Sequence, residues 1–183
     1  MRKGSGVILA LAGAGALILL LSKKKEPSGS PGSPGSKIDK QKFIDLILPY
    51  VKAVGSKLGI PYKFLLAQII IETSWGRSLL FINEFNVGGV KAVPGQAYKV
   101  YPTWEYIKGV KTRKYEPFAK YKNLQDGILG YSKIFQNRYF RKYLNKTKDP
   151  YKYATLLQSG SPKYATDINY VPKIHKLIDT LKA

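Results

Sequence analysis

The stretch PYKFLLAQIIIETSWG, residues 61–76, predicts a buried helix that carries one acidic side chain close to its end. Pro61 suits the first turn of a helix, and Gly76 is a residue that ends one. Glu72 follows an apolar run near the C-terminus of this helix, where the helix dipole disfavours an anion. Apolar neighbours and the dipole both favour the neutral acid, so we expect the pKa of Glu72 to be raised. Taken alone, a Glu at a helix end is also an ordinary structural residue.

Helical spacing continues on both sides of this stretch. Apolar residues recur every three or four positions from Phe43 to Leu58, with Pro49 as a place for a kink. Further helices are expected over residues 123–136, 149–160 and 167–182. Between residues 86 and 122, Gly and Pro punctuate short Val/Tyr-rich pieces at 97–101 and 104–110, which predicts loops and a small β-hairpin. The expected fold class is therefore α+β, mostly helical with a small hairpin lobe.

The composition narrows the chemistry. The chain has 183 residues, with 31 Lys and Arg, 11 Asp and Glu, one His and no Cys. Without Cys there is no thiolate metal site, disulfide or cysteine nucleophile, and a single His makes Ser-His-Asp or multi-His metal chemistry hard to build. Catalysis must come from the few carboxylates, and no metal or organic cofactor is implied. The net charge of +20 predicts a polyanionic partner.

The first 36 residues differ from the rest. Residues 7–21 are an unbroken apolar run, and residues 4–22 carry no charge, a length of about 28 Å as a helix. We expect residues 1–22 to be a retained transmembrane anchor that contacts lipid through residues 7–21. A cleaved secretory signal is the alternative. Residues 23–36 form a Gly/Ser/Pro linker, and residues 37–183 form one catalytic domain with a net charge of +16. Basic residues on both flanks leave the orientation open.

Three motifs follow one another along the domain. They are Q-x-x-x-E-T-x-W-G-x-S at residues 68–78, N-V-G-G-V-K at 86–91, and Y-A-T-D-x-x-Y at 164–170. Together they resemble the peptidoglycan-cleaving glucosaminidase domains of glycoside hydrolase family 73, which occur in autolysins, flagellar muramidases and phage lysins. The resemblance covers roughly residues 43–178. It implies a lysozyme-like fold, with a helical lobe and a small β lobe on either side of a groove.

The resemblance also implies catalytic roles. It makes Glu72 the general acid that protonates the leaving glycosidic oxygen. The second acid of the family lies on the β hairpin, where Glu105 in T-W-E-Y matches best as general base or charge stabiliser, with Glu116 in reserve. Tyr164 matches a family tyrosine near the acid, which positions water or the acetamido group of the substrate. The chain departs from the family at Gly88, where an aromatic residue is usual.

Substrate contacts are expected from aromatic and basic side chains. Trp104 and Tyr106 on the hairpin present flat faces for sugar rings, and Trp75 either does so or packs in the core. Lys91 is placed to meet the carboxylates of muropeptides. The predicted substrate contacts are Trp75, Asn86, Lys91, Trp104, Tyr106 and Tyr170. The basic and aromatic run at 135–153 has a nucleic-acid-like composition, but it contains no nucleic-acid motif, so no specific nucleic acid is expected.

These features predict a membrane-anchored peptidoglycan hydrolase that cleaves β-1,4 glycosidic bonds, of the N-acetylglucosaminidase type. The domain would face the cell wall, either on a bacterial envelope or from the membrane of a phage virion that opens the wall at infection. One alternative is a lytic transglycosylase, which needs a single Glu and leaves an anhydro sugar. Another is a catalytically silent tether that binds peptidoglycan. The sequence does not indicate an oligomeric state.

Overall fold

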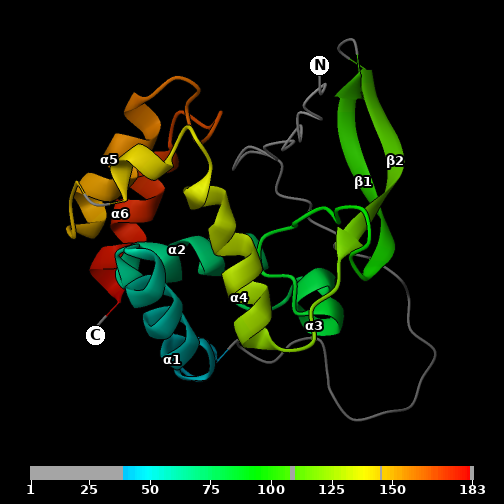
Figure 1. Ribbon diagram of the computed structural model, residues 1–183, viewed down its shortest axis with the longest axis horizontal. Coiled ribbons are helices and arrows are strands. Elements are labelled where there is room, and N and C mark those ends of the chain that lie inside the picture. The colour runs from blue at the N-terminus through cyan, green and yellow to red at the C-terminus, as the bar shows by residue number, and fades with distance from the viewer. Residues whose placement is uncertain (1–38, 108–109, 145, 182–183) are drawn as a thin grey trace, which may run out of the picture.

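The structure is a computed structural model that describes residues 39–107, 110–144 and 146–181. These residues form a mostly helical body with one two-stranded antiparallel sheet projecting from it (Figure 1). The α-helices are α1 (Lys40–Leu58), α2 (Tyr62–Thr73), α3 (Leu79–Glu84), α4 (Leu124–Ser132), α5 (Pro150–Ser159) and α6 (Tyr170–Thr180), with short 3₁₀ turns at Lys133–Gln136 and Arg141–Tyr143. The strands are β1 (Tyr98–Ile107) and β2 (Val110–Ala119). The predicted fold class is therefore confirmed for the domain.

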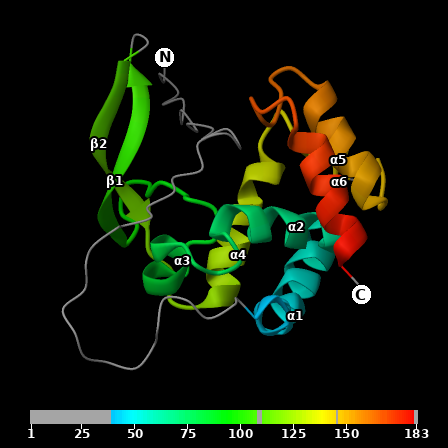
Figure 2. The ribbon, with the colours of Figure 1, turned by 180° about the vertical axis from the view of Figure 1, so that it is seen from behind.

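Helix α2 occupies the centre of the helical body. It contacts α1, α5 and α6, and the two views of the ribbon place it among these helices (Figures 1 and 2). Leu65, Leu66 and Ile69 are fully buried, as expected of a helix that is apolar on most of its surface. The end of α2 that carries Glu72 lies on the side of the body that faces the hairpin (Figure 1).

The helix boundaries follow the capping residues. Asp39, Asn123 and Asp149 accept backbone N–H bonds at the starts of α1, α4 and α5, which satisfies donors that have no partner within the helix. Pro49 does not end α1. The last helix begins at Tyr170 and not at residue 167 as expected, because Asp167 accepts from the backbone N–H of Asn169 in a turn before the helix.

The expected β-hairpin is present, and its strands are longer than the short pieces that Gly and Pro mark off in the sequence. The pieces at 97–101 and 104–110 are not separated by a loop, because residues 98–107 form the single strand β1. The partner strand is β2, and the register runs from Tyr98 opposite Ala119 to Ile107 opposite Val110. Pro102 does not interrupt β1, since a two-stranded sheet has an unpaired edge on each strand where a missing N–H is tolerated.

A buried carboxylate joins the hairpin to the helical body. Glu84, at the end of α3, is only 4% exposed. The Tyr101 hydroxyl of β1 donates to its Oε1 at 3.0 Å, and Lys120 Nζ, just after β2, lies 3.4 Å from its Oε2. The backbone N–H of Tyr121 donates to the Glu84 carbonyl. Both strands are thus attached at their base to one residue of α3, a helix that the sequence pattern did not predict.

The expected anchor and linker, residues 1–22 and 23–36, lie outside the described residues. Within the described part of the chain, no helix combines the length and the apolar character needed to cross a membrane.

Candidate active site

Glu72 lies in the last turn of α2, immediately before an unusual stretch of backbone. Ser74, Trp75 and Gly76 have φ angles of 52°, 62° and 79°, and the first two are not glycine. Such left-handed residues cost conformational energy and are concentrated at functional sites. The Thr73 hydroxyl holds the turn, because it donates to the Ile69 carbonyl at 2.6 Å and accepts from the Gly76 N–H at 3.0 Å. The turn therefore fixes the position at which α2 stops, and with it the position of Glu72.

Burial raises the pKa of the Glu72 carboxyl from 4.5 to about 7. The direction agrees with the expectation from the sequence, and the cause is the loss of water around a carboxylate whose neighbours on α2 are apolar. Near neutral pH a substantial fraction of the molecules therefore carry a protonated Glu72. A carboxylic acid with a pKa close to the working pH is well suited to donate a proton in a reaction.

Three buried tyrosines interact electrostatically with the Glu72 carboxyl group. The charge of Glu72 contributes to raising the pKa of Tyr131, Tyr164 and Tyr170, in addition to the larger effect of their burial. The Tyr131 and Tyr164 hydroxyl oxygens are 3.1 Å apart and share a hydrogen bond, while the Gln68 amide donates to the Tyr170 hydroxyl. All three phenols stay neutral at physiological pH, so Glu72 is the group of this cluster that titrates near pH 7.

Tyr164 is both a core residue and a neighbour of the acid. Its ring stacks on Phe135 with centroids 5.6 Å apart and meets Phe140 edge-on at 5.4 Å, and only 5% of the residue is exposed. These contacts fix the ring, so its hydroxyl is held in one direction. The structure thus brings Glu72 together with Tyr164 and Tyr170, which follow it in the sequence by 92 and 98 residues.

Tyr131 of α4 was not among the residues singled out from the sequence. A Cβ atom added at Gly88 would lie 2.0 Å from the Tyr131 ring, so the ring fills the space beside that glycine. The Tyr131 ring of α4 therefore occupies the space that a side chain at position 88 would need. The spacing of Leu124, Ile128 and Tyr131 places Tyr131 on the buried face of its helix, but no sequence signal connects it to Glu72.

The second motif builds the loop between the two lobes. Asn86 is 1% exposed, and its amide donates to the Val90 and Ala119 carbonyls while its Oδ1 accepts from the Val90 N–H. Its polar atoms are therefore engaged by the protein, and its expected contact with substrate remains a prediction. Lys91 Nζ lies 3.5 Å from Glu116 Oε2, so the reserve carboxylate and the expected muropeptide-binding lysine form an ion pair.

The remaining predicted contacts fall in different environments. Trp104 on β1 is 50% exposed, as expected for a side chain that meets a sugar ring. Trp75 is partly buried against Phe43, and the ammonium group of Lys40 lies 4.8 Å from the centre of its ring. Tyr170 is 2% exposed, so a contact with substrate would require that the cluster open.

Glu105 and Tyr106 can be placed only by their backbone. They lie in β1 opposite Thr112 and Lys111, one and two residues beyond Trp104. Their side chains lie outside what the structure describes, so the role of Glu105 as second acid stays a prediction. Within the described ranges, no three His, Cys, Asp or Glu side chains gather as a metal site requires.

A helical body that presents a buried acid at a helix end, with a two-stranded hairpin beside it, defines a glycoside hydrolase domain of the lysozyme-like class. The chain belongs to the glucosaminidase family: residues 48–183 match the family model described as mannosyl-glycoprotein endo-beta-N-acetylglucosaminidase. The resemblance inferred from the three motifs is thereby confirmed.

Relatives and solved structures agree with this assignment. A probable N-acetylmuramidase of Lactococcus lactis subsp. lactis is 29% identical over 143 residues, and the peptidoglycan hydrolase FlgJ of Pseudomonas aeruginosa is 25% identical over 143 residues. In each case the match covers 74% of this chain, but only 32% and 35% of the relatives, so the chain spans about a third of their length.

Two solved structures share the fold. The catalytic domain of the autolysin Auto from Listeria monocytogenes superposes with a TM-score of 0.71 at 24% identity, covering 85% of this chain and 96% of that one. A glycoside hydrolase domain of Salmonella typhimurium FlgJ gives a TM-score of 0.64 at 27% identity, covering 79% and 98%. The first likeness supports the fold, and the second supports the family as well.

Proposed function

We propose that this chain is a membrane-tethered peptidoglycan hydrolase that cleaves the β-1,4 glycan between N-acetylated sugars, as an N-acetylglucosaminidase. The observation that carries the proposal is Glu72, a carboxyl group that burial keeps protonated up to about pH 7. It lies in the last turn of α2, within the residues that match the glucosaminidase family model. The names of the relatives, which include muramidases and peptidoglycan hydrolases, support peptidoglycan as the substrate.

In the proposed mechanism Glu72 donates its proton to the glycosidic oxygen while positive charge develops on the sugar ring. Glu105 then activates water or stabilises that charge from the hairpin. The Tyr164 hydroxyl, held by its stacking on Phe135 and its bond to Tyr131, orients water or the acetamido group. A second carboxylate about 5–5.5 Å from Glu72 would act as nucleophile, and one about 6.5–9.5 Å away would activate water.

The charge of the chain supports a wall substrate. A net charge of +20 favours association with an acidic polymer, and this attraction weakens as salt screens it. Residues 7–21 would hold the domain at a membrane, with residues 23–36 as spacer, on a bacterial envelope or in a phage virion. Deletion of residues 1–36 tests this: the full chain should sediment with membranes after high-salt washing, and the truncated chain should not. A truncated chain that still sediments contradicts the tether.

The activity is tested with the 183-residue chain in mild detergent on purified peptidoglycan. Wild type, Glu72→Gln and the matched control Asp45→Asn, which changes an exposed acid on α1, are compared. Released fragments are reduced and identified by mass spectrometry. We expect new reducing-end N-acetylglucosamine from wild type and control, and a loss of about 10³-fold with Glu72→Gln.

Each other product would change the proposal. Reducing-end N-acetylmuramic acid would make the chain a muramidase, and anhydro-muramic ends would make it a transglycosylase that does not need Glu105. No cleavage by wild type, with binding to the wall retained, would make it a tethering module and overturn the enzymatic proposal.

A further inference from the structure

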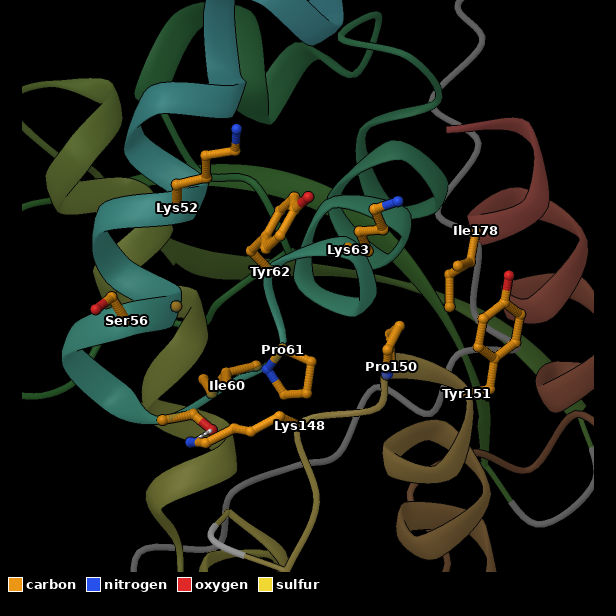
Figure 3. Close-up of a pocket in the computed structure, with 12 residues that line it drawn as sticks. Lys52, Ser56, Ile60, Pro61, Tyr62, Lys63, Lys148, Pro150, Tyr151 and Ile178 are labelled. Atoms are coloured by element: carbon orange, nitrogen blue, oxygen red, sulfur yellow. Dashed lines mark hydrogen bonds between the residues drawn. The ribbon is translucent and has the colours of Figure 1, made fainter. Parts of the chain in front are cut away.

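A groove of about 710 Å³ lies at the opposite end of α2 from Glu72 (Figure 3). It is bordered by the C-terminal half of α1, the turn into α2, the start of α5 and the end of α6. Ten residues separate Tyr62 at the groove from Glu72, a distance of about 15 Å along the helix. Because both lie on one rigid helix, a ligand in this groove would be held at a fixed distance from the proposed acid. We name it the lysine groove, after Lys52, Lys63 and Lys148 in its lining.

The described residues that line the lysine groove include positively charged side chains and no negatively charged ones. Three ammonium groups border it, and the residues that line it in the described chain include no Asp or Glu. Lys52 Nζ lies 5.3 Å from the centre of the Tyr62 ring, and Lys148 Nζ donates to the Gly59 carbonyl at 3.3 Å. Lys52 and Lys148 reach the groove from α1 and from the segment before α5, on either side of Ile60 and Pro61 (Figure 3). The groove is therefore complementary to an anion.

The start of α2 adds to this charge. Its N-cap residue is Pro61, which offers no side-chain hydrogen bond, and Pro61, Tyr62 and Lys63 at the positive end of this 12-residue helix line the groove. The neighbouring helix start is different, because Asp149 caps α5 by accepting from the N–H groups of Tyr151 and Lys152. Asp149 thus caps α5, while the start of α2 has no side-chain cap of this kind.

Two carboxylates of the surrounding elements offset part of this charge, because Asp179 and Asp149 both help to raise the pKa of the groove-lining Tyr151. Asp149 is engaged at the start of α5, and Asp179 of α6 accepts from the Tyr151 hydroxyl at 2.6 Å. The floor of the groove is apolar, with Ile60 and Ile178 each 3% exposed. A ligand that fits should therefore combine carboxylates with small apolar groups and have an extended shape.

We propose that the lysine groove is an accessory site that binds the carboxylate-bearing peptide stems of peptidoglycan. The inference rests on the proposed function, because that function supplies the polymer. Peptide stems carry free carboxylates and methyl groups, which match the ammonium groups and the apolar floor. Two contacts on one rigid helix, one at each end, would raise the residence time on the wall by multivalency.

Binding is measured on uncleaved polymer so that it does not depend on activity. In the Glu72→Gln background, Lys52, Lys63 and Lys148 are changed together to Gln. The matched control changes the exposed Lys122, Lys133 and Lys176 to Gln, with the same loss of charge. Co-sedimentation is measured with peptidoglycan freed of phosphate-bearing polymers, with untreated walls, and with peptidoglycan whose peptides an amidase has removed.

We expect the groove variant to bind purified peptidoglycan about tenfold more weakly, equivalent to about 1.4 kcal/mol, and the control less than about twofold. Removal of the peptides should abolish this difference. In the active background, the groove variant should cleave short soluble glycan fragments at the wild-type rate.

Other results overturn the proposal. Equal loss in both variants would mean that net charge alone binds the wall. A difference seen only on untreated walls would assign the groove to a phosphate polymer. Because binding is scored without cleavage, failure of the groove and failure of the hydrolase function give separate readouts.

Discussion

The two lobes support their functional residues by different means. Glu72 lies on α2, and the preceding residues Gln68 and Ile69 of this helix are fully buried. The packing around α2 therefore fixes the backbone that carries the acid. The hairpin instead exposes large side chains along its length, with Trp104 at 50% and Tyr115 at 65%. Its buried residues include Phe118 near the base, at 1% exposed, and Thr103 in the middle of β1, at 3%.

This difference has a consequence for catalysis. An isolated two-stranded hairpin is marginally stable in water, so β1 and β2 depend on their base, where Tyr101 and Lys120 meet Glu84. The helical body can raise the pKa of an acid because its packed residues remove water from around the carboxyl group. The more exposed hairpin would instead serve to place its carboxylate beside the substrate. We therefore expect the acid to be fixed and the second carboxylate to act through an element with a lower local stability.

The strongest test of this division is Glu105→Gln. If the hairpin supplies the second catalytic group, kcat should fall about 10²-fold, within the range for loss of one acid–base group. Glu116→Gln is the matched control on the paired strand, and because Glu116 forms an ion pair with Lys91 we expect it to change kcat less than about threefold. Turnover of purified peptidoglycan is the measurement. The reverse order of effects would transfer the role to Glu116.

Burial of the ionised Glu72 carboxylate lowers the stability of the folded chain, so we expect Glu72→Gln to be more stable than wild type at high pH. The pKa of Glu72 is about 7 in the folded chain and near 4.5 when unfolded, so the folded state holds the extra proton between these values. Wild-type stability therefore falls as pH rises from about 4.5 to 7, by about 3 kcal/mol in total.

Gln stays neutral, so Glu72→Gln should match wild type at pH 4 and exceed its stability at pH 8 by up to this amount. Urea unfolding at the two pH values measures the difference, with Asp45→Asn as the exposed control. A gap that does not change with pH would contradict burial as the cause of the raised pKa.

The sequence predicted the helical body better than the hairpin, for a physical reason. Apolar spacing and caps such as Asn123 and Asp149 are local signals, and the helices that they mark are present. The full length of β1 was not predicted because Pro102 looks like a break in the sequence, whereas the unpaired edge of a two-stranded sheet accommodates it. The contact of Tyr131 with Gly88 joins α4 to a distant loop, and no periodicity in a single sequence encodes such a contact.

That contact can be tested by Gly88→Ala. The new Cβ would lie 2.0 Å from the Tyr131 ring, so the ring or the loop must move, at a cost of about 1–3 kcal/mol in unfolding free energy. In a Tyr131→Ala background the same substitution should cost much less, giving a coupling of about 1–2 kcal/mol in a double-mutant cycle. Chemical denaturation of the four proteins provides the numbers. Additive costs would show that the two residues do not compete for the same space.

The smallest expected effect separates packing from chemistry within the tyrosine cluster. Tyr131→Phe and Tyr164→Phe each remove one partner of the same 3.1 Å hydrogen bond, so each should cost about 1 kcal/mol of stability. If Tyr164 also orients water or substrate, its loss should lower kcat/KM about tenfold, while Tyr131→Phe should lower it about threefold or less. Steady-state kinetics on soluble glycan fragments compares the two variants. Equal losses in activity would mean that Tyr164 acts only by holding the cluster together, and the helical body would then contribute Glu72 as its single reacting group.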